Sequence, residues 1–455
     1  MLRPLTPSTS RLLAAALLLL PAVAAGQPLA FGSSDDPFEL GSGFAPSDLV
    51  VGGVYGGPAY LPDTWRGAVR AEVEAARGRL SAGVAATLHP AAGGLYEPEA
   101  DDAYDAVRAV QYLRLNATPR SRVYARLGPT ERMTLGVGAL VRGYRTTTAY
   151  DERTLGLEVA GAGRRLRAGA FADDLRLSGV VGGQVSVATD LRVGPLRDVT
   201  FGLAAVHDLA LPGVAGDSSL TGIEASAHGL LLGDGVLSAS PFVAHARYLG
   251  KGSTLGAGLD LAAEGINDAL RARARAALFV STADFVPGHV SPFYAISNTA
   301  ERVVIDRTFF DDDEGSTLAG TPLDSLGSGF DLVVDFGVIA FGTLEVSQHV
   351  RRHVGADRAS AYGVRVAGRV PGGPRLAFEL QREGFRGLFD LFGDLGDFNA
   401  LVLDVGVPVG RGGEVLVRSR YGYRRLGPDD GVTEPDRFLV ERRFEPLVGL
   451  RLALD

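Results

Sequence analysis

Arginines recur at alternating positions in two stretches of the sequence. One stretch holds Arg271, Arg273 and Arg275, and the other holds Arg418, Arg420 and Arg424. A guanidinium group stays charged at physiological pH and donates paired hydrogen bonds to carboxylates and phosphates. Such side chains lining one surface would attract anions, and in a pore they would favour the passage of anions.

The residues around the first stretch indicate which element positions these arginines. As a helix, residues 269–280 would place both charge and apolar carbon on every side. As a strand they separate cleanly, because successive side chains point to opposite faces. The face without arginines then consists of Leu270, Ala272, Ala274, Ala276, Leu278 and Val280. An arginine facing lipid at mid-membrane would cost about 2–4 kcal/mol, so we expect the apolar face to meet lipid and the arginines to face a lumen.

The same alternation recurs along most of the chain after residue 48. It is found at residues 80–88, 133–141, 199–205, 255–261, 401–409, 415–423 and 448–454. No apolar run beyond the N-terminus approaches the about 20 residues that a membrane-spanning helix needs. Hydrophobic residues nevertheless make up 46% of the chain, which argues against disorder. We therefore predict an all-β fold, a single transmembrane antiparallel up-and-down β-barrel of roughly 18 strands, within a range of roughly 16–22.

The N-terminus has the layout of a secretory signal. Arg3 precedes the apolar run Leu12–Leu20, and small residues around Ala24 follow it. We expect a cleaved signal peptide at residues 1–26, a periplasmic segment at 27–48 and an outer-membrane barrel at 49–455. The longest stretch without alternation, residues 284–329, predicts a long external loop or a constriction loop.

Three segments test the strand prediction. Residues 65–76 alternate, but their apolar residues also fit a helical stripe, and we favour a strand because strands surround them. Residues 133–141 are predicted as a strand with its apolar side chains opposite Thr134, Gly136 and Gly138. Residues 401–409 and 415–423 flank a glycine turn and predict a hairpin.

Two interpretations of the inward arginines remain open. They could create an anion-favouring lumen, or they could pair with lumenal carboxylates such as Glu379, Asp404 and Asp260. The formal net charge of −8 is compatible with pairing. It also gives no reason to expect nucleic-acid binding.

No other residues form a recognisable chemical site. The chain has no cysteine, which excludes disulfides and thiolate metal sites. The acidic run at 311–314 lacks the ligand spacing of a calcium loop, and His349 and His353 flank arginines that would repel a cation. No phosphate loop, dinucleotide motif or nucleophile elbow occurs in a suitable setting. We expect no catalytic residues, no metal and no cofactor.

Two stretches resemble sequences of large, functionally uncharacterised outer-membrane β-barrels of Gram-negative bacteria. One is Val123–Gly128 followed by Thr134–Gly138, and the other is Gly179–Gly183 with the later strand that ends at His207-Asp208. The resemblance spans residues 105–210 and implies a porin-like barrel, without a solute or site residues. The chain departs from many such barrels because it ends in Leu454-Asp455 rather than in an aromatic residue.

These observations support two functional hypotheses. The leading one is a porin-like channel for small solutes, with a small anion as a candidate solute. The alternative is a non-transporting barrel in surface assembly, secretion or polysaccharide export. The expected partners are outer-membrane lipid and either an envelope protein or further copies of the chain. A barrel enzyme would need a catalytic constellation at the rim, and the sequence shows none.

Overall fold

The structure is a computed structural model that consists of one continuous series of strands. It describes residues 49–454 except 62–63, 92, 97–108, 117–121, 149–153, 178, 210–219, 234–235, 265–269, 295–302, 306–314, 317–327, 341–343, 355–359, 371–372, 386–398, 411 and 426–436. The predicted signal peptide, the predicted periplasmic segment and the acidic run at 311–314 lie outside the described residues. No helix among the described residues is long and apolar enough to cross a membrane.

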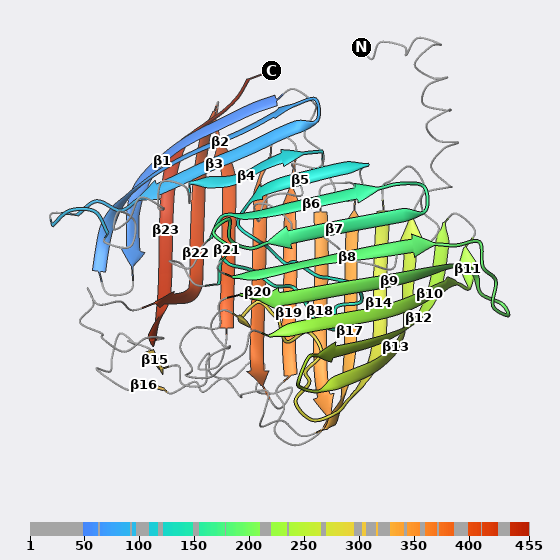
Figure 1. Ribbon diagram of the computed structural model, residues 1–455. Coiled ribbons are helices and arrows are strands. Elements are labelled where there is room, and N and C mark those ends of the chain that lie inside the picture. Colours follow the sequence, from blue (N-terminus) through green and yellow to red (C-terminus); the bar gives the residue numbers. More distant parts are fainter. Residues whose placement is uncertain are drawn as a thin grey trace, which may run out of the picture.

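The strands follow one another around the molecule in chain order (Figure 1). The first half comprises β1 (Leu49–Leu61), β2 (Thr64–Arg77), β3 (Leu80–Leu88), β4 (Val110–Leu115), β5 (Val123–Gly128), β6 (Gly156–Ala162), β7 (Leu166–Ala172), β8 (Val180–Ala188), β9 (Arg197–Asp208), β10 (Thr221–Leu230), β11 (Leu232–Gly233) and β12 (Leu237–Tyr248). The second half comprises β13 (Ser253–Glu264), β14 (Leu270–Ser281), β15 (Val303–Ile305), β16 (Gly315–Ser316), β17 (Gly329–Ala340), β18 (Leu344–Val354), β19 (Ser360–Arg369), β20 (Arg375–Phe385), β21 (Asn399–Val409), β22 (Gly413–Arg425) and β23 (Arg437–Leu454).

Pairing of the first strand with the last closes the sheet into a barrel. Val50 on β1 lies opposite Leu454 on β23, and this antiparallel register continues to the pair Gly56 and Val448. The short strands β11, β15 and β16 are additions to the wall, which itself has 20 antiparallel strands. The central prediction of 18 strands was therefore wrong, although 20 lies within the predicted range of 16–22. The strands β4 to β7 are only 6 or 7 residues long and give weak alternation in the sequence.

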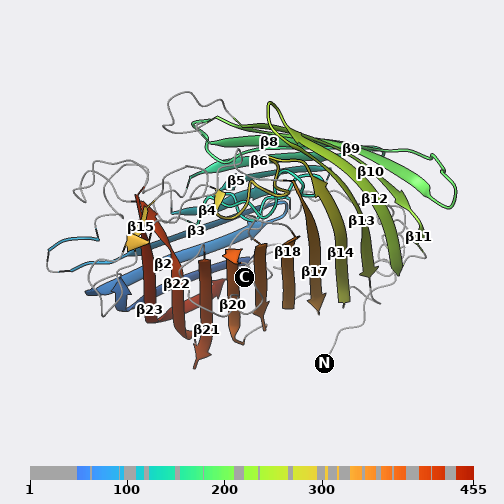
Figure 2. The same ribbon diagram turned by 90° about the horizontal axis from the view of Figure 1, so that it is seen from below.

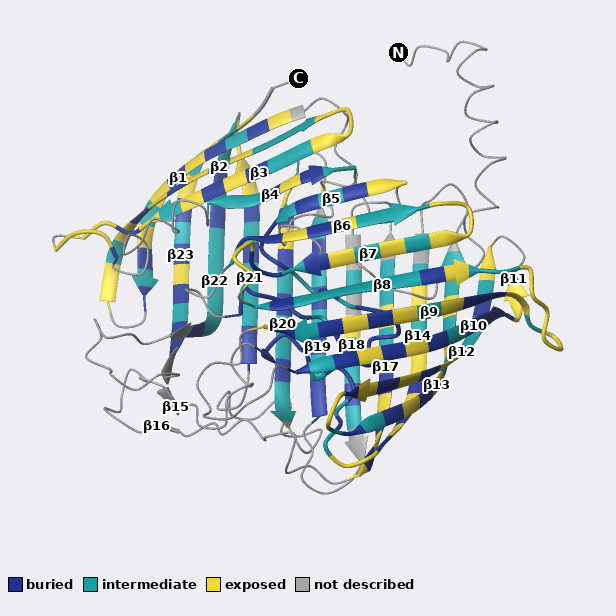
Figure 3. Ribbon diagram, in the orientation of Figure 1, coloured by how far each residue is buried: buried dark blue, intermediate teal, exposed yellow. Residues whose placement is uncertain are grey.

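The two faces of the wall differ in chemistry, and this makes the barrel membrane-spanning. Exposed and buried residues alternate along the strands (Figure 3). Outward residues such as Val54 and Val448 are 61% and 65% exposed, whereas the inward Tyr55 is 1% exposed. An apolar exterior around a polar interior, in a closed antiparallel barrel with an even number of strands, is the architecture of bacterial outer-membrane proteins. The fold thus places the chain in the outer membrane.

The lengths of the connections orient the barrel. At one end the connections are short, the longest being 189–196, and β1 begins and β23 ends there. At the other end lie the long connections 129–155 and 282–328. Outer-membrane barrels have short periplasmic turns and long extracellular loops, so the short connections face the periplasm.

The sequence predictions for individual segments had different outcomes. Residues 65–76 lie in β2, which confirms a strand rather than a helix. The hairpin predicted across residues 401–423 is confirmed by the pairing of β21 with β22. The strand predicted at 133–141 was wrong, because these residues belong to the connection between β5 and β6.

Candidate functional site inside the barrel

The connection between β5 and β6 turns into the barrel instead of projecting outward. We call residues 129–148 the inward segment. Its start is held by Arg126, whose Nη1 donates to the Pro129 carbonyl oxygen at 2.8 Å and lies 3.3 Å from Glu158 Oε1. Farther along the segment, Met133 and Tyr144 donate their backbone N–H groups to each other's carbonyl oxygens. Residues 134–143 therefore form a loop whose two ends are hydrogen-bonded together. Met133, Leu135, Val137, Leu140 and Val141 are all 0% exposed.

Glycines explain why an alternating stretch is not a strand. Gly136, Gly138 and Gly143 have φ values of +58°, +80° and +65°, in the left-handed region that L-residues with a Cβ rarely adopt. These angles turn the chain three times within eight residues, which no extended strand allows. At Gly136 there is also no room for a side chain, since a Cβ atom would lie 2.0 Å from Glu224 Oε1.

Wall side chains bind the backbone of the tip of the inward segment. Glu224 on β10 is 1% exposed and accepts the Val137 N–H at Oε1 (2.7 Å) and the Ala139 N–H at Oε2 (3.1 Å). Gln184 on β8 accepts the Gly136 N–H at 2.7 Å. These side chains satisfy backbone groups that water cannot reach, which is why the segment can lie buried without secondary structure.

Two arginines complete the binding of this tip. Arg275 on β14 donates from Nη1 to the Val137 carbonyl oxygen at 3.1 Å, and Arg142 of the segment donates to the same oxygen at 2.7 Å. Arg275 also pairs with Asp260 at 2.5 Å, and Arg142 with Asp335 at 2.5 Å. The tip therefore lies in a network of alternating charges that joins β10, β13, β14 and β17.

A second segment packs on the first. We call residues 283–294 the second inward segment. All but the first of them belong to the stretch 284–329, which was predicted from sequence as a long external loop or a constriction loop. Val290 forms a parallel bridge with Val141 and accepts the Arg142 N–H at 3.0 Å. Phe285 is 0% exposed and stacks on Tyr248 of the wall with ring centroids 4.8 Å apart. The two inward segments and the wall between β7 and β17 share one apolar core.

Each inward segment has a tyrosine whose hydroxyl donates a hydrogen bond to a carboxylate at the extracellular end of the wall. Tyr144 donates to Asp173, and Tyr294 donates to Asp208 at 2.7 Å. Burial raises the pKa of Asp173 to about 6. Arg145 of the inward segment reaches the other side of the barrel wall, where it pairs with Glu379 on β20.

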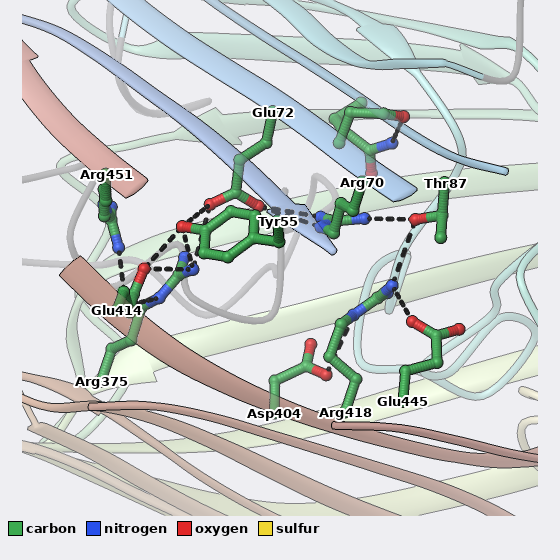
Figure 4. Close-up of polar contacts among 12 residues, drawn as sticks. Tyr55, Arg70, Glu72, Thr87, Arg375, Asp404, Glu414, Arg418, Glu445 and Arg451 are labelled. Atoms are coloured by element: carbon green, nitrogen blue, oxygen red, sulfur yellow. Dashed lines mark hydrogen bonds and ion pairs between the residues drawn. The ribbon is translucent and has the colours of Figure 1, made fainter. Parts of the chain in front are cut away.

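The opposite wall carries an ionic network of its own (Figure 4). Tyr55 on β1 donates to Glu414 Oε2 on β22 at 2.5 Å, and Arg375 on β20 donates to Glu414 Oε1 at 2.9 Å and Glu72 Oε1 at 3.0 Å. Arg70 donates to the other oxygen of Glu72 at 3.1 Å. Strands β1, β2, β20 and β22 are thus joined by charge across the inner face.

The arginines singled out from sequence have different surroundings. Arg418 lies 2.8 Å from Glu445 Oε2 and 3.5 Å from Asp404 Oδ1, and Arg420 donates to Asp404 at 2.6 Å. Arg275 pairs with Asp260, as described above, and Arg273 is exposed. The side chains of Arg271 and Arg424 lie outside the described part of the chain, although their backbones belong to β14 and β22. Ion pairing, one of the two interpretations left open, is present at Arg275, Arg418 and Arg420.

Sequence reasoning missed the residues that hold the inward segment. Glu224 and Gln184 were not singled out, because one carboxylate or amide on a strand gives no signal of its distant partner. His349 was considered for a metal and instead lies 2.5 Å from Asp335 Oδ1. Among the described residues no group of His, Cys, Asp and Glu could hold a metal ion.

No protein-family model matches this sequence, and no curated protein is similar to it in sequence. Several solved outer-membrane barrels are similar in shape at low scores. Wzi of Escherichia coli, a carbohydrate-binding barrel involved in group 1 capsule assembly, is 11% identical with a TM-score of 0.35, covering 85% of this chain and 86% of its own. OpdL of Pseudomonas aeruginosa is 11% identical with a TM-score of 0.30, covering 90% and 98%. The ferric enterobactin receptor of the same species is 10% identical with a TM-score of 0.36, covering 90% and 82%. At these scores the likeness identifies no relative, and the assignment as an outer-membrane β-barrel rests on the closed strand register and the two faces of the wall.

Proposed function

We propose that this barrel is a channel for small polar solutes, narrowed by the inward segment. The observation that carries the proposal is the attachment of residues 129–148 to the inner wall by Gln184, Glu224, Arg275 and Glu379. A segment held from several strands restricts the cross-section at a fixed place. The arginine–carboxylate pairs around it make that place polar, with no strong excess of either charge.

The number of strands supports a passage beside the segment. A barrel of about 8 strands is filled by its own side chains, whereas barrels of about 16–18 strands enclose an aqueous channel. By this relation a wall of 20 strands encloses a lumen that is wider than its own side chains fill, and the two inward segments occupy part of it. The inward segment contacts β8, β10, β14, β17 and β20, and its Thr148 carbonyl oxygen accepts the Tyr423 N–H of β22 at 3.3 Å. The network of Figure 4 joins β1, β2, β20 and β22, so the segment reaches two of the same strands. In a wall of 20 strands β1 and β2 lie opposite β10 to β13, so we place the passage beside the segment, along β1 and β2.

Single-channel conductance of the refolded protein in planar bilayers tests this proposal. In the variant to compare, residues 134–143 are replaced by Asn-Gly, because Met133 and Tyr144 already form a hydrogen-bonded pair that a two-residue turn can close. We expect small, steady steps from the natural protein and steps several times larger from the variant. Glu224→Gln, which loosens the segment without shortening it, serves as a second variant.

Three outcomes would contradict the proposal. Equal conductance of the natural protein and the shortened variant would show that the segment does not restrict the passage. Silence of the natural protein with conductance of the variant would mean a plugged barrel, which favours the non-transporting alternative. Silence of both, in preparations whose circular dichroism shows the full strand content, would exclude a channel.

A further inference from the structure

Exposed arginines are concentrated on one side of the periplasmic rim of the barrel. They lie at the turns that join β2 to β3, β4 to β5, β6 to β7 and β8 to β9. The exposed arginines there are Arg77, Arg79, Arg122, Arg164, Arg165, Arg192 and Arg197. The exposed carboxylates in the described residues of the same turns are Asp190 and Asp198. We call these four turns the arginine rim.

One of these arginines pairs with a carboxylate of the rim, and another donates to a backbone oxygen of the neighbouring strand β11. Arg165 pairs with Asp190, although both side chains stay largely exposed, at 59% and 79%. Arg197 donates to the Gly233 carbonyl oxygen at 2.8 Å. The rim therefore has an excess of positive charge in a chain whose formal net charge is −8.

Each of the four turns also presents large apolar side chains beside its arginines. Leu80 follows Arg79 and is 56% exposed, Val123 follows Arg122 and is 56% exposed, and Leu166 follows Arg165 and is 52% exposed. Leu191 and Val193, on either side of Arg192, are 47% and 53% exposed.

The register shows that these apolar side chains meet lipid. Arg77 and Leu80 are directly paired across the β2–β3 ladder, and residues that are paired in this way point to the same face. That face continues through Val84 and Leu88, which are 47% and 44% exposed on the outside of the barrel. Arg77 thus lies at the periplasmic edge of the apolar outer surface. There its alkyl chain can contact the acyl layer while its guanidinium reaches the headgroup layer.

We propose that the arginine rim binds the phosphates of anionic phospholipids in the periplasmic leaflet of the outer membrane. The apolar residues enter the acyl layer and the neighbouring guanidinium groups pair with phosphate oxygens, for which the planar fork of arginine is suited. Contact with an anionic membrane surface is worth roughly a fivefold gain in binding for each basic side chain. The rim covers only four turns, so it would enrich anionic lipid on one side of the barrel.

Native mass spectrometry of the full chain in detergent tests this with phosphatidylglycerol and phosphatidylcholine of equal acyl chains. We expect wild-type protein to retain phosphatidylglycerol preferentially. Arg77→Gln with Arg79→Gln should lower that preference by roughly fivefold or more, and glutamine at Arg77, Arg79, Arg122, Arg164 and Arg192 together should abolish it. The matched control, Arg176→Gln with Arg247→Gln, makes the same charge change at exposed arginines of the extracellular end and should leave the preference unchanged.

The results that would overturn the proposal are equally specific. An unchanged lipid preference in the five-arginine variant would exclude the rim as the binding surface. An equal loss in the control would mean that only net charge matters. If polyglutamate binds to wild type but not to the rim variant, while the lipid preference of the two is the same, the partner is an acidic protein and not a lipid. Added inorganic phosphate should not compete, because it lacks the acyl chains that the apolar residues contact.

Discussion

Replacing Glu224 by Gln should release the tip of the inward segment from the barrel wall. The carboxylate accepts two backbone N–H groups, one at each oxygen, at 2.7 and 3.1 Å. Glutamine keeps one acceptor and turns a donor toward the second N–H group, so one of the two hydrogen bonds must be lost. The variant also loses the negative charge that faces the guanidinium groups of Arg275 and Arg142.

The size of the effect follows from these contacts. A hydrogen bond to a charged acceptor contributes about 1.5–3 kcal/mol, and a buried N–H group without a partner costs about 1–3 kcal/mol. Part of this is offset because glutamine is easier to bury than a carboxylate. We therefore expect the free energy of opening of the segment to fall by about 2–4 kcal/mol. This corresponds to an equilibrium constant for opening that is roughly 30- to 1,000-fold larger.

Hydrogen–deuterium exchange of the peptide that contains residues 135–141 measures this directly, because only opening exposes the Val137 and Ala139 amides. The matched control is Glu74→Gln, which removes a carboxylate that accepts the Tyr112 hydroxyl at 2.6 Å on β2, away from the segment. Exchange of 135–141 should accelerate in Glu224→Gln and stay unchanged in Glu74→Gln. If exchange in Glu224→Gln stays within threefold of wild type, the carboxylate does not hold the segment, and the assignment of this contact is wrong.

Further variants test neighbouring parts of the site. Gly136→Ala should disturb the tip as strongly as Glu224→Gln, because the new Cβ atom would overlap Glu224 and the backbone φ at this position is +58°. The same hydrogen–deuterium exchange experiment measures the effect. Exchange as slow as in the wild type would refute the steric argument. Arg275→Gln leaves the carboxylate of Asp260 without its 2.5 Å partner and should lower the midpoint of thermal unfolding by several degrees, which circular dichroism would detect. Burial lowers the pKa of His289 to about 3, so packing of residues 283–294 should weaken as pH falls below about 6.5, where the released imidazole becomes charged. His289→Gln should therefore make their amide exchange, corrected for intrinsic pH dependence, less sensitive to pH between 7 and about 4.5. An equal response of both proteins would exclude this histidine as the cause.

The wall could be predicted from sequence because a barrel strand carries its own signature. From Leu270 to Ala276, β14 carries apolar residues on one face and arginines on the other, and this local rule places Ala276 outside and Arg275 inside without knowledge of any partner. The prediction fails where a strand is too short to show the rule, as in the six residues of β4 and of β5. The partner of each inward arginine also remained open, because it depends on register between strands.

The inward segment was misread for a different physical reason. Residues 133–141 alternate between apolar residues and small or polar ones, as a strand does, but their apolar side chains face a core inside the barrel and not lipid. Both environments select for apolar residues, so periodicity alone could not distinguish them. The distinguishing feature is glycine at 136, 138 and 143, each at positive φ, in a stretch whose backbone hydrogen bonds go largely to side chains and to the second inward segment.

This difference indicates how the segment and the wall depend on each other. A strand satisfies its backbone with neighbouring strands, so changes in one side chain leave it in place. The inward segment has few such bonds and is held by Glu224, Gln184 and Arg275, whose own positions are fixed by the barrel. Loss of a single wall side chain should therefore loosen the tip of the segment while the barrel stays closed. A channel constricted in this way can change its passage without unfolding, and the same substitution that releases the segment should enlarge the conductance.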